Sequence, residues 1–392
     1  MDDTEAPPSA RIESVDIVRG IVMLLMAIDH VRVYAGVPPG SSTSASLFLT
    51  RWVTHFCVPA FVFLGGASAF LHGRKLGSPG ALSRFLVSRG LVLVVLELTV
   101  LRFFWTFNFD YANYSLAGVI WMLGWCMVVL AGLIRLPWAA IVTVGAVIVA
   151  GHNLTDNVLA AVGPAAQQSG LAWLWQILYF GGQINVLGFP VAILYSLLPW
   201  AGLMALGYAF GRVLVLPAEA RVRWCLRLGA LATVLFLVLR AANGYGDPRP
   251  WSGERGPAWI SFLGTTKYPG SLDFLLMTLG PMLLALGAID RARGPIGRAL
   301  TLFGRVPMFY YLLHIPLIHL IFVGLSVARF GAVIPWMTAN HPMNPGPPPD
   351  GYPYGLPALY AVTALVIVLL YFPCRWYARA RAERPQWWMS YL

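Results

Sequence analysis

The chain of 392 residues is 58% hydrophobic and only 11% charged, and its mean hydropathy is +0.69. These values exclude an ordinary soluble globular protein and indicate a polytopic membrane protein. A net charge of +11 would suit a nucleic-acid partner, but the arginines are dispersed among loops without a dense run. Membrane orientation explains them better, so nucleic acid is not expected as a partner.

The acidic stretch at residues 1–10 is expected to be a disordered tail, because it shows no cleavage-site pattern before the first apolar run. One all-α transmembrane domain is expected over residues 11–380, followed by a cytoplasmic C-terminal tail at 381–392. The four cysteines lie far apart in apolar segments without metal spacing. They are therefore interpreted as packing residues rather than as disulfide partners or metal ligands.

Apolar runs of about 17 to 25 residues are long enough to span a bilayer as helices. The sequence holds about ten of them. They cover residues 14–35, 48–72, 83–104, 115–135, 137–153, 188–213, 221–242, 269–289, 301–328 and 357–378.

Basic residues predict which side of the membrane each connection faces. With the N-terminus inside, 19 Lys and Arg residues lie on the inner side and 8 on the outer side. An excess of cations on cytoplasmic segments is typical of membrane proteins, so both termini are expected in the cytoplasm.

The connections assigned to the outer side are long and rich in Gly, Pro, Trp and Tyr. Segment 152–187 contains an apolar run too short to span alone, which predicts a re-entrant element, a surface-lying element or an additional span. Segment 243–268 is polar and aromatic, and the Pro-rich segment 331–356 is not expected to form a helix. These loops either recognise something outside the cell or merely cap the bundle.

The first span carries ionisable residues at both ends, Arg19 near one end and Asp29, His30 and Arg32 near the other. Eleven residues separate Arg19 from His30, so the two share a helix face about 16 Å apart along the axis. Charged groups in a span cost about 2.5 to 3.5 kcal/mol each, which favours a functional role. The alternative is an anchoring helix with snorkelling arginines and a packed histidine.

Other spans carry polar residues as well. Arg51 and His55 open the second span, and Glu97 lies midway along the third, where an Arg or His from a neighbouring helix is the expected partner. In the ninth span, Tyr311 and His314 are three residues apart and share a face.

Histidine beside a carboxylate can take a proton from a hydroxyl or amine and return it to a leaving group. The sequence lacks a Gly-x-Ser-x-Gly elbow, a His-Glu-x-x-His motif and a Gly-rich phosphate loop. We therefore expect acid–base chemistry within a helix bundle, without a metal or prosthetic group.

Several motifs resemble the catalytic domain of heparan-alpha-glucosaminide N-acetyltransferase, in particular that family's bacterial members, over about residues 11 to 380. They are Asp16-x-x-Arg19-Gly20, Asp29-His30, the stretch from Phe61 to Ser68, Gly304-x6-Tyr311-x-x-His314, Pro199-Trp200-x-Gly202-x-Met204-x-x-Gly207-Tyr208 and Thr266-Lys267-Tyr268-Pro269. The spacing Arg19-x10-His30 is also similar to the first helix of bacterial membrane O-acyltransferases.

The resemblance implies transfer of an acyl group from cytosolic acetyl-CoA to a sugar or glycan across a bacterial inner (cytoplasmic) membrane. It implies lipids, acyl-CoA and the acceptor as partners and leaves a homodimer open. The outer loop 36–50 lacks the histidine that the human enzyme carries there, so the catalytic role is expected at His30 and His55. Three roles are assigned on this basis: catalysis to His30 oriented by Asp29, with His55 and His314; oxyanion or acceptor binding to Arg32, Arg51, Glu97 and Tyr311; and binding of the CoA donor to Arg19 and Arg305.

Two other functions use the same sequence features. A proton-coupled transporter or glycan exporter could relay protons through Asp29, His30 and Glu97, although the chain shows no internal repeat of the kind that transporters carry. A purely structural membrane protein is the other alternative.

Overall fold

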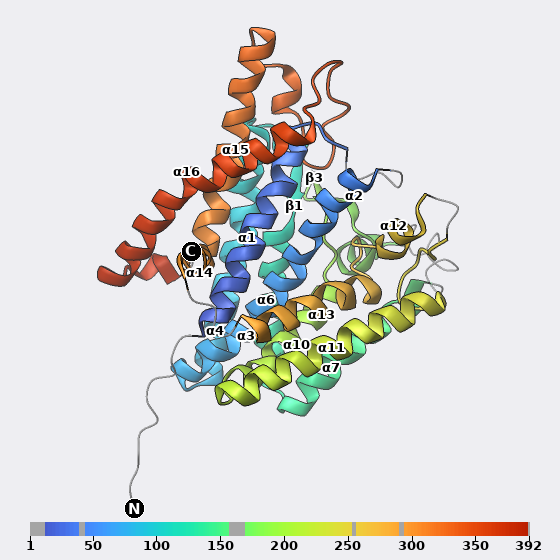
Figure 1. The fold of residues 1–392 in the computed structure, drawn as a ribbon, viewed down its shortest axis with the longest axis vertical. Coiled ribbons are helices and arrows are strands. Elements are labelled where there is room, and N and C mark those ends of the chain that lie inside the picture. Colours follow the sequence, from blue (N-terminus) through green and yellow to red (C-terminus); the bar gives the residue numbers. More distant parts are fainter. Residues whose placement is uncertain (1–11, 39–43, 157–168, 253–255, 290–293, 391–392) are drawn as a thin grey trace, which may run out of the picture.

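The computed structural model is a helix bundle in which α1 runs through the centre (Figure 1). The structure describes residues 12–38, 44–156, 169–252, 256–289 and 294–390, so the tail expected at 1–10 lies outside the described residues. The α-helices are α1 Glu13–Tyr34, α2 Ala45–Trp52, α3 Cys57–Leu76, α4 Pro79–Leu96, α5 Arg102–Thr106, α6 Val119–Leu133, α7 Trp138–Gly151, α9 Ala172–Trp175, α10 Leu198–Leu214, α11 Ala218–Ala242, α12 Ala258–Leu263, α13 Leu272–Ala288, α14 Pro295–Arg305, α15 Pro307–Phe330 and α16 Leu356–Glu383.

The helical fold class is confirmed, and long apolar helices make this an integral membrane protein. Among the described residues, four helical segments are long and apolar enough to cross a membrane: 45–76, 218–242, 307–330 and 356–383. Three further apolar helices are shorter: 119–133, 138–151 and 272–288. Length and composition thus support four of the ten predicted spans.

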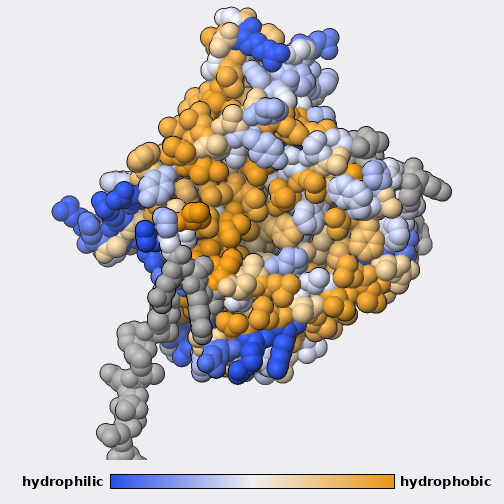
Figure 2. Space-filling view, viewed as in Figure 1, coloured by the Kyte–Doolittle hydropathy of each residue, from blue (hydrophilic) through white to orange (hydrophobic). Residues whose placement is uncertain are grey.

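The outer surface agrees with a lipid environment. Figure 2 shows a broad hydrophobic face, with hydrophilic residues gathered at the top, at the left and along the lower edge of the view. On α11, Leu231 and Val238 are 54% and 58% exposed, and Phe372 on α16 is 64% exposed. Such exposure of large apolar side chains is costly in water and favourable against acyl chains.

Several predicted spans have different boundaries in the structure, and two show the reasons clearly. The run 188–213 begins as a strand, β3 Phe189–Ile193, and becomes helical only at Leu198. The run 301–328 is divided between α14 and α15 at Val306, whose backbone leaves the helical region. Proline disfavours the helical conformation of the residue before it, which accounts for the break before Pro307.

A small sheet lies among the connections. Strand β3 pairs in parallel with β1 Ser115–Ala117, and antiparallel with β2 Gly182–Val186. The described part of segment 152–187 therefore ends in this sheet, after the short helix α9. Within residues 331–355, all of which the structure describes, no α-helix occurs, as expected from their prolines, but a short 3-10 helix forms at Pro335–Thr338.

Glycines allow the closest helix contacts. A Cβ at Gly304 would lie 1.8 Å from the carbonyl oxygen of Asp16, where α14 packs on α1. A Cβ at Gly66 would lie 2.1 Å from the carbonyl oxygen of Met204, where α3 packs on α10. Backbone-to-backbone contact of this kind is typical of membrane helices.

Candidate functional site

Two histidines from distant parts of the chain meet in the bundle. His30 lies near the end of α1 and His314 lies in α15, and their nitrogens Nδ1 and Nε2 are 2.6 Å apart. The rings stack with centroids 4.8 Å apart, and His314 is fully buried. The structure thus joins two of the four residues that the sequence analysis assigned to catalysis.

Backbone contacts fix the tautomers of this pair. His314 Nδ1 lies 2.7 Å from the carbonyl oxygen of Tyr311, which can only accept a hydrogen bond, so Nδ1 carries the proton. In the neutral ring Nε2 of His314 is then an acceptor, and His30 Nδ1 donates to it. This leaves the lone pair of His30 on Nε2, for which the described residues provide no hydrogen-bond donor. A neutral imidazole held in this way can act as a general base.

Aromatic rings enclose the pair. Trp105 stands edge-on to His30 at a centroid distance of 4.8 Å, and Tyr311 does so at 6.2 Å. Tyr311 also contacts His314 at 5.1 Å. The shared face predicted for Tyr311 and His314 is confirmed. Trp105, which the sequence analysis did not single out, follows an unusual π-helical turn at Glu97–Leu101.

Asp29 does not hydrogen-bond His30. Its carboxylate accepts a hydrogen bond from Nε of Arg32 at 3.0 Å, and Arg32 also donates to the carbonyl oxygen of Val37. The expectation that Asp29 orients His30 was therefore wrong in its contact, because the arginine one helical turn later offers a closer, charged partner. His314 holds the ring instead.

Glu97 is fully buried, but its partner is not the Arg or His that the sequence analysis expected. One carboxylate oxygen accepts hydrogen bonds from the backbone N–H groups of Ile120 and Trp121, at 2.7 and 3.2 Å. These donors are the free N–H groups of the first turn of α6, where a negative charge is favourable. Glu97 therefore anchors the start of α6 to the π-helical turn Glu97–Leu101.

A cavity of about 1150 Å³ lies beside Tyr311. Its lining is apolar at Met23, Leu93 and Ile120, and Tyr311 belongs to it as well. Seven cationic side chains line it: Arg19, Arg74, Lys75, Arg89, Arg221, Arg305 and Arg381. All seven belong to the segments that the charge distribution assigns to the cytoplasmic side. The cavity therefore suits a long ligand with an anionic end.

The two residues assigned to donor binding lie on this cavity wall. Arg19 donates to the carbonyl oxygen of Leu64 at 3.1 Å and to the hydroxyl of Ser68, which ties α1 to α3. Asp16 lies 3.7 Å from both Arg19 and Arg305. Arg19 thus shapes the wall as well as charging it, whereas Arg305 is 43% exposed.

His55 is a further buried histidine. Its ring is 5.4 Å from that of Phe274, and neither of its nitrogens has a partner among the described residues. The charges of Arg51 and Lys267 act on both His55 and Asp29. Lys267 was named only within a motif by the sequence analysis, because a loop lysine has no periodic signal.

Arg102, near the end of the third predicted span, has a structural role. Its guanidinium is buried and donates to the carbonyl oxygens of Tyr114, at 2.9 Å, and Asp110, at 2.6 Å. It therefore holds the 107–114 connection in place.

Comparison with known proteins adds one finding. The family model described as "Heparan-alpha-glucosaminide N-acetyltransferase, catalytic" matches residues 11–241, which is more than half of the chain. Among curated proteins, none matches. The matched range contains Arg19, His30 and His55, and it ends before Lys267 and His314.

Proposed function

Since the chain belongs to the heparan-alpha-glucosaminide N-acetyltransferase catalytic family, we propose that this membrane acetyltransferase takes its acetyl group from acetyl-CoA. The acceptor is an amine or hydroxyl of a sugar or glycan on the opposite side of the membrane. The observation that carries the proposal is the cavity, whose lining includes seven cations and Tyr311, a residue that contacts both His30 and His314.

The cavity suits the shape and charge of the donor. The phosphates of CoA would bind among exposed cations such as Arg74, Lys75 and Arg305, where charge-assisted hydrogen bonds are strong. The apolar wall suits the pantetheine arm. Arg19 and His30 lie about 16 Å apart along α1, about half of the ~30 Å hydrocarbon thickness of a bilayer. A donor bound from the cytoplasm would therefore place its thioester near the histidines.

The histidine pair supplies the acid–base chemistry. His30 Nε2 takes the proton of the acceptor as its oxygen or nitrogen attacks the thioester carbonyl, and returns it to the sulfur of the leaving CoA. His314 stabilises the imidazolium, because its Nε2 accepts from His30 Nδ1 throughout. Tyr311 lines the donor cavity and contacts both rings, so it lies where the cavity meets the pair. His55 and Arg51 are proposed to contact the acceptor.

Two measurements test this function. Purified protein in nanodiscs should bind acetyl-CoA and transfer a radiolabelled acetyl group to glucosamine or to a glucosamine-terminated glycan. A protein that neither binds acetyl-CoA nor consumes it, but carries protons in liposomes, would instead be a transporter.

Sidedness is tested by labelling in intact bacterial cells. Ser78 and Asp350 are exposed, whereas all four native cysteines are buried. A membrane-impermeant maleimide should label Asp350→Cys and should leave Ser78→Cys unlabelled until the membrane is opened. The opposite pattern would place the basic end of the cavity outside and remove its access to cytosolic CoA.

A further inference from the structure

Lys267 is a nearly buried cation without an anionic partner. Its side chain is 7% exposed, and the described residues give its ammonium neither an ion pair nor a hydrogen bond. Its contacts are with aromatic rings, 5.9 Å from the centroid of Tyr195 and 5.4 Å from that of Tyr268. Ring faces attract a cation without neutralising it. An uncompensated buried charge is costly, so it indicates an anion that is bound during function.

The charge of Lys267 reaches the histidine site. It acts on His30, Asp29 and His55. Asp29 does not neutralise it, because that carboxylate already pairs with Arg32 at 3.0 Å. Lys267 therefore adds positive charge to the surroundings of His30 and His55, where the proposed reaction creates negative charge.

The backbone around Lys267 is held by a buried carboxylate. Asp247 accepts hydrogen bonds from the backbone N–H of Thr266 at 2.6 Å and from its hydroxyl at 2.8 Å. It also accepts one from the hydroxyl of Ser271 at 2.7 Å. These bonds close a short hairpin in which Lys267 pairs with Gly270. The lysine thus has a fixed backbone on both sides.

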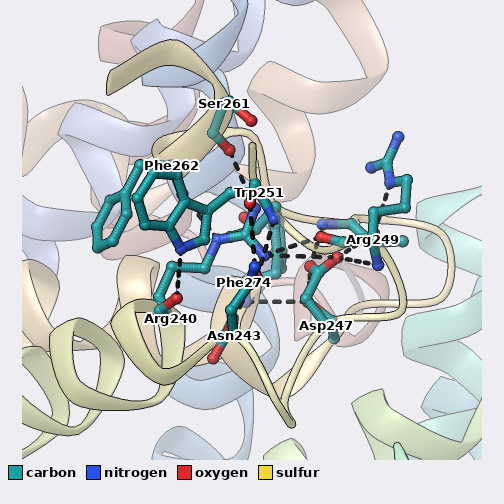
Figure 3. Close-up of polar contacts among 12 residues, drawn as sticks. Arg240, Asn243, Asp247, Arg249, Trp251, Ser261, Phe262 and Phe274 are labelled. Atoms are coloured by element: carbon teal, nitrogen blue, oxygen red, sulfur yellow. Dashed lines mark hydrogen bonds and ion pairs between the residues drawn. The ribbon is translucent and has the colours of Figure 1, made fainter. Parts of the chain in front are cut away.

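Asp247 is held in turn by Arg240, as Figure 3 shows. The guanidinium of Arg240 lies 3.9 Å from Asp247 and 3.8 Å from Asp273, and all three side chains are almost completely buried. Arg240 also donates to three carbonyl oxygens of the connection between α11 and α13, those of Arg249, Ser261 and Phe262. The buried ion pairs and hydrogen bonds of Arg240 and Asp247 therefore hold the backbone on which Lys267 is placed.

We infer that Lys267 is a catalytic residue of the acetyl transfer, and that Asp247 and Arg240 are its positioning residues. This rests on the proposed function. When the acceptor attacks the thioester carbonyl, a new C–N or C–O bond forms, the acceptor proton passes to His30, and the carbonyl electron pair moves to oxygen. The ammonium of Lys267 stabilises that oxyanion. Re-formation of the carbonyl then breaks the C–S bond, and the thiolate takes the proton from His30.

The test compares Lys267→Met with Lys267→Arg, using acetyl-CoA and either glucosamine or glucosamine 6-phosphate as acceptor. Loss of one oxyanion-stabilising group lowers kcat by about 10²- to 10³-fold. Lys267→Met should show this loss with both acceptors while KM and acetyl-CoA affinity stay near wild type. Lys267→Arg, which keeps the charge, should recover most of the lost kcat. Arg223→Met is the matched control, since Arg223 is 62% exposed and paired with Glu219.

Each outcome separates the inference from the proposed function. If the wild type transfers acetyl groups and Lys267→Met keeps its kcat, the inference fails and the function stands. A loss confined to the KM for glucosamine 6-phosphate would also overturn it, since Lys267 would then bind an acceptor phosphate. If the wild type binds acetyl-CoA but never transfers acetyl groups to either acceptor or to water, the proposed function fails instead.

The positioning role has its own readout. Asp247→Asn alone should lower kcat without changing acetyl-CoA affinity. In a protein that already carries Lys267→Met, it should lower kcat little further, because both residues act through the same ammonium group. An equal loss in both backgrounds would show that Asp247 supports the fold generally and not Lys267.

Discussion

His30 Nδ1 lies 2.6 Å from His314 Nε2, although 284 residues separate the two in sequence. His314 is itself held by the carbonyl oxygen of Tyr311 one helical turn before it. A backbone carbonyl therefore sets the protonation of a distant ring through one intervening histidine. The base of the proposed reaction depends on the packing of α15 against α1 as much as on its own residue type.

The first prediction concerns the base. His30→Ala should abolish acetyl transfer, because no other described residue places a free imidazole nitrogen beside Tyr311 on the cavity wall. Acetyl-CoA affinity, measured by calorimetry, should change less than threefold. An active His30→Ala enzyme would move the role of base to His55, whose nitrogens also lack partners.

The second prediction concerns His314. His314→Asn should lower kcat by about 10²- to 10⁴-fold, the cost of losing the group that fixes a catalytic imidazole, with donor affinity again retained. His314→Gln, whose side-chain carbonyl can accept from His30 Nδ1, should lose less than His314→Ala. Equal losses in the Gln and Ala variants would show that the hydrogen bond does not orient His30.

The third prediction concerns the donor. Arg89 lines the basic part of the cavity, and Arg89→Ala should raise the KM for acetyl-CoA by about ten- to a hundredfold, the range for a lost charged hydrogen bond. The KM for acetyl-pantetheine, which lacks the nucleotide phosphates, should not change. A similar increase for both donors would place the CoA phosphates elsewhere.

The fourth prediction concerns helix packing. Gly66→Ala should destabilise the protein by about 1 to 3 kcal/mol, because the new Cβ would meet the backbone of Met204. Gly324→Ala in α15 is the matched control, since nothing lies within 4 Å of its added Cβ. That variant should be unchanged or up to about 1 kcal/mol more stable. Thermal unfolding in detergent distinguishes the two.

The fifth prediction concerns pH. Burial lowers the pKa of His341, in the loop between α15 and α16, to about 4. The folded state therefore favours the neutral ring, and stability present above the usual pKa of 6.5 is lost as the pH falls towards 4. His341→Gln should flatten the decline in melting temperature between pH 6.5 and 4. An unchanged decline would assign it to other groups.

The sequence alone determined the class of protein and most of its helices. Periodic apolar runs locate a helix wherever side-chain burial or lipid contact dominates, so α1, α7, α11 and α13 lie within a few residues of their predicted ranges. Motifs local to one segment, such as Asp29-His30, also identified the family, because they need no partner to be recognised.

Only the tertiary structure decided which groups meet. Glu97 found backbone N–H groups at the start of α6 rather than a cation, and Asp29 found Arg32 rather than His30. Which groups form hydrogen bonds depends on the exact positions of neighbouring helices, and a hydrophobic pattern carries no information about those positions. The same holds for Lys267, which a loop brings to the histidines through the buried bonds of Asp247 and Arg240.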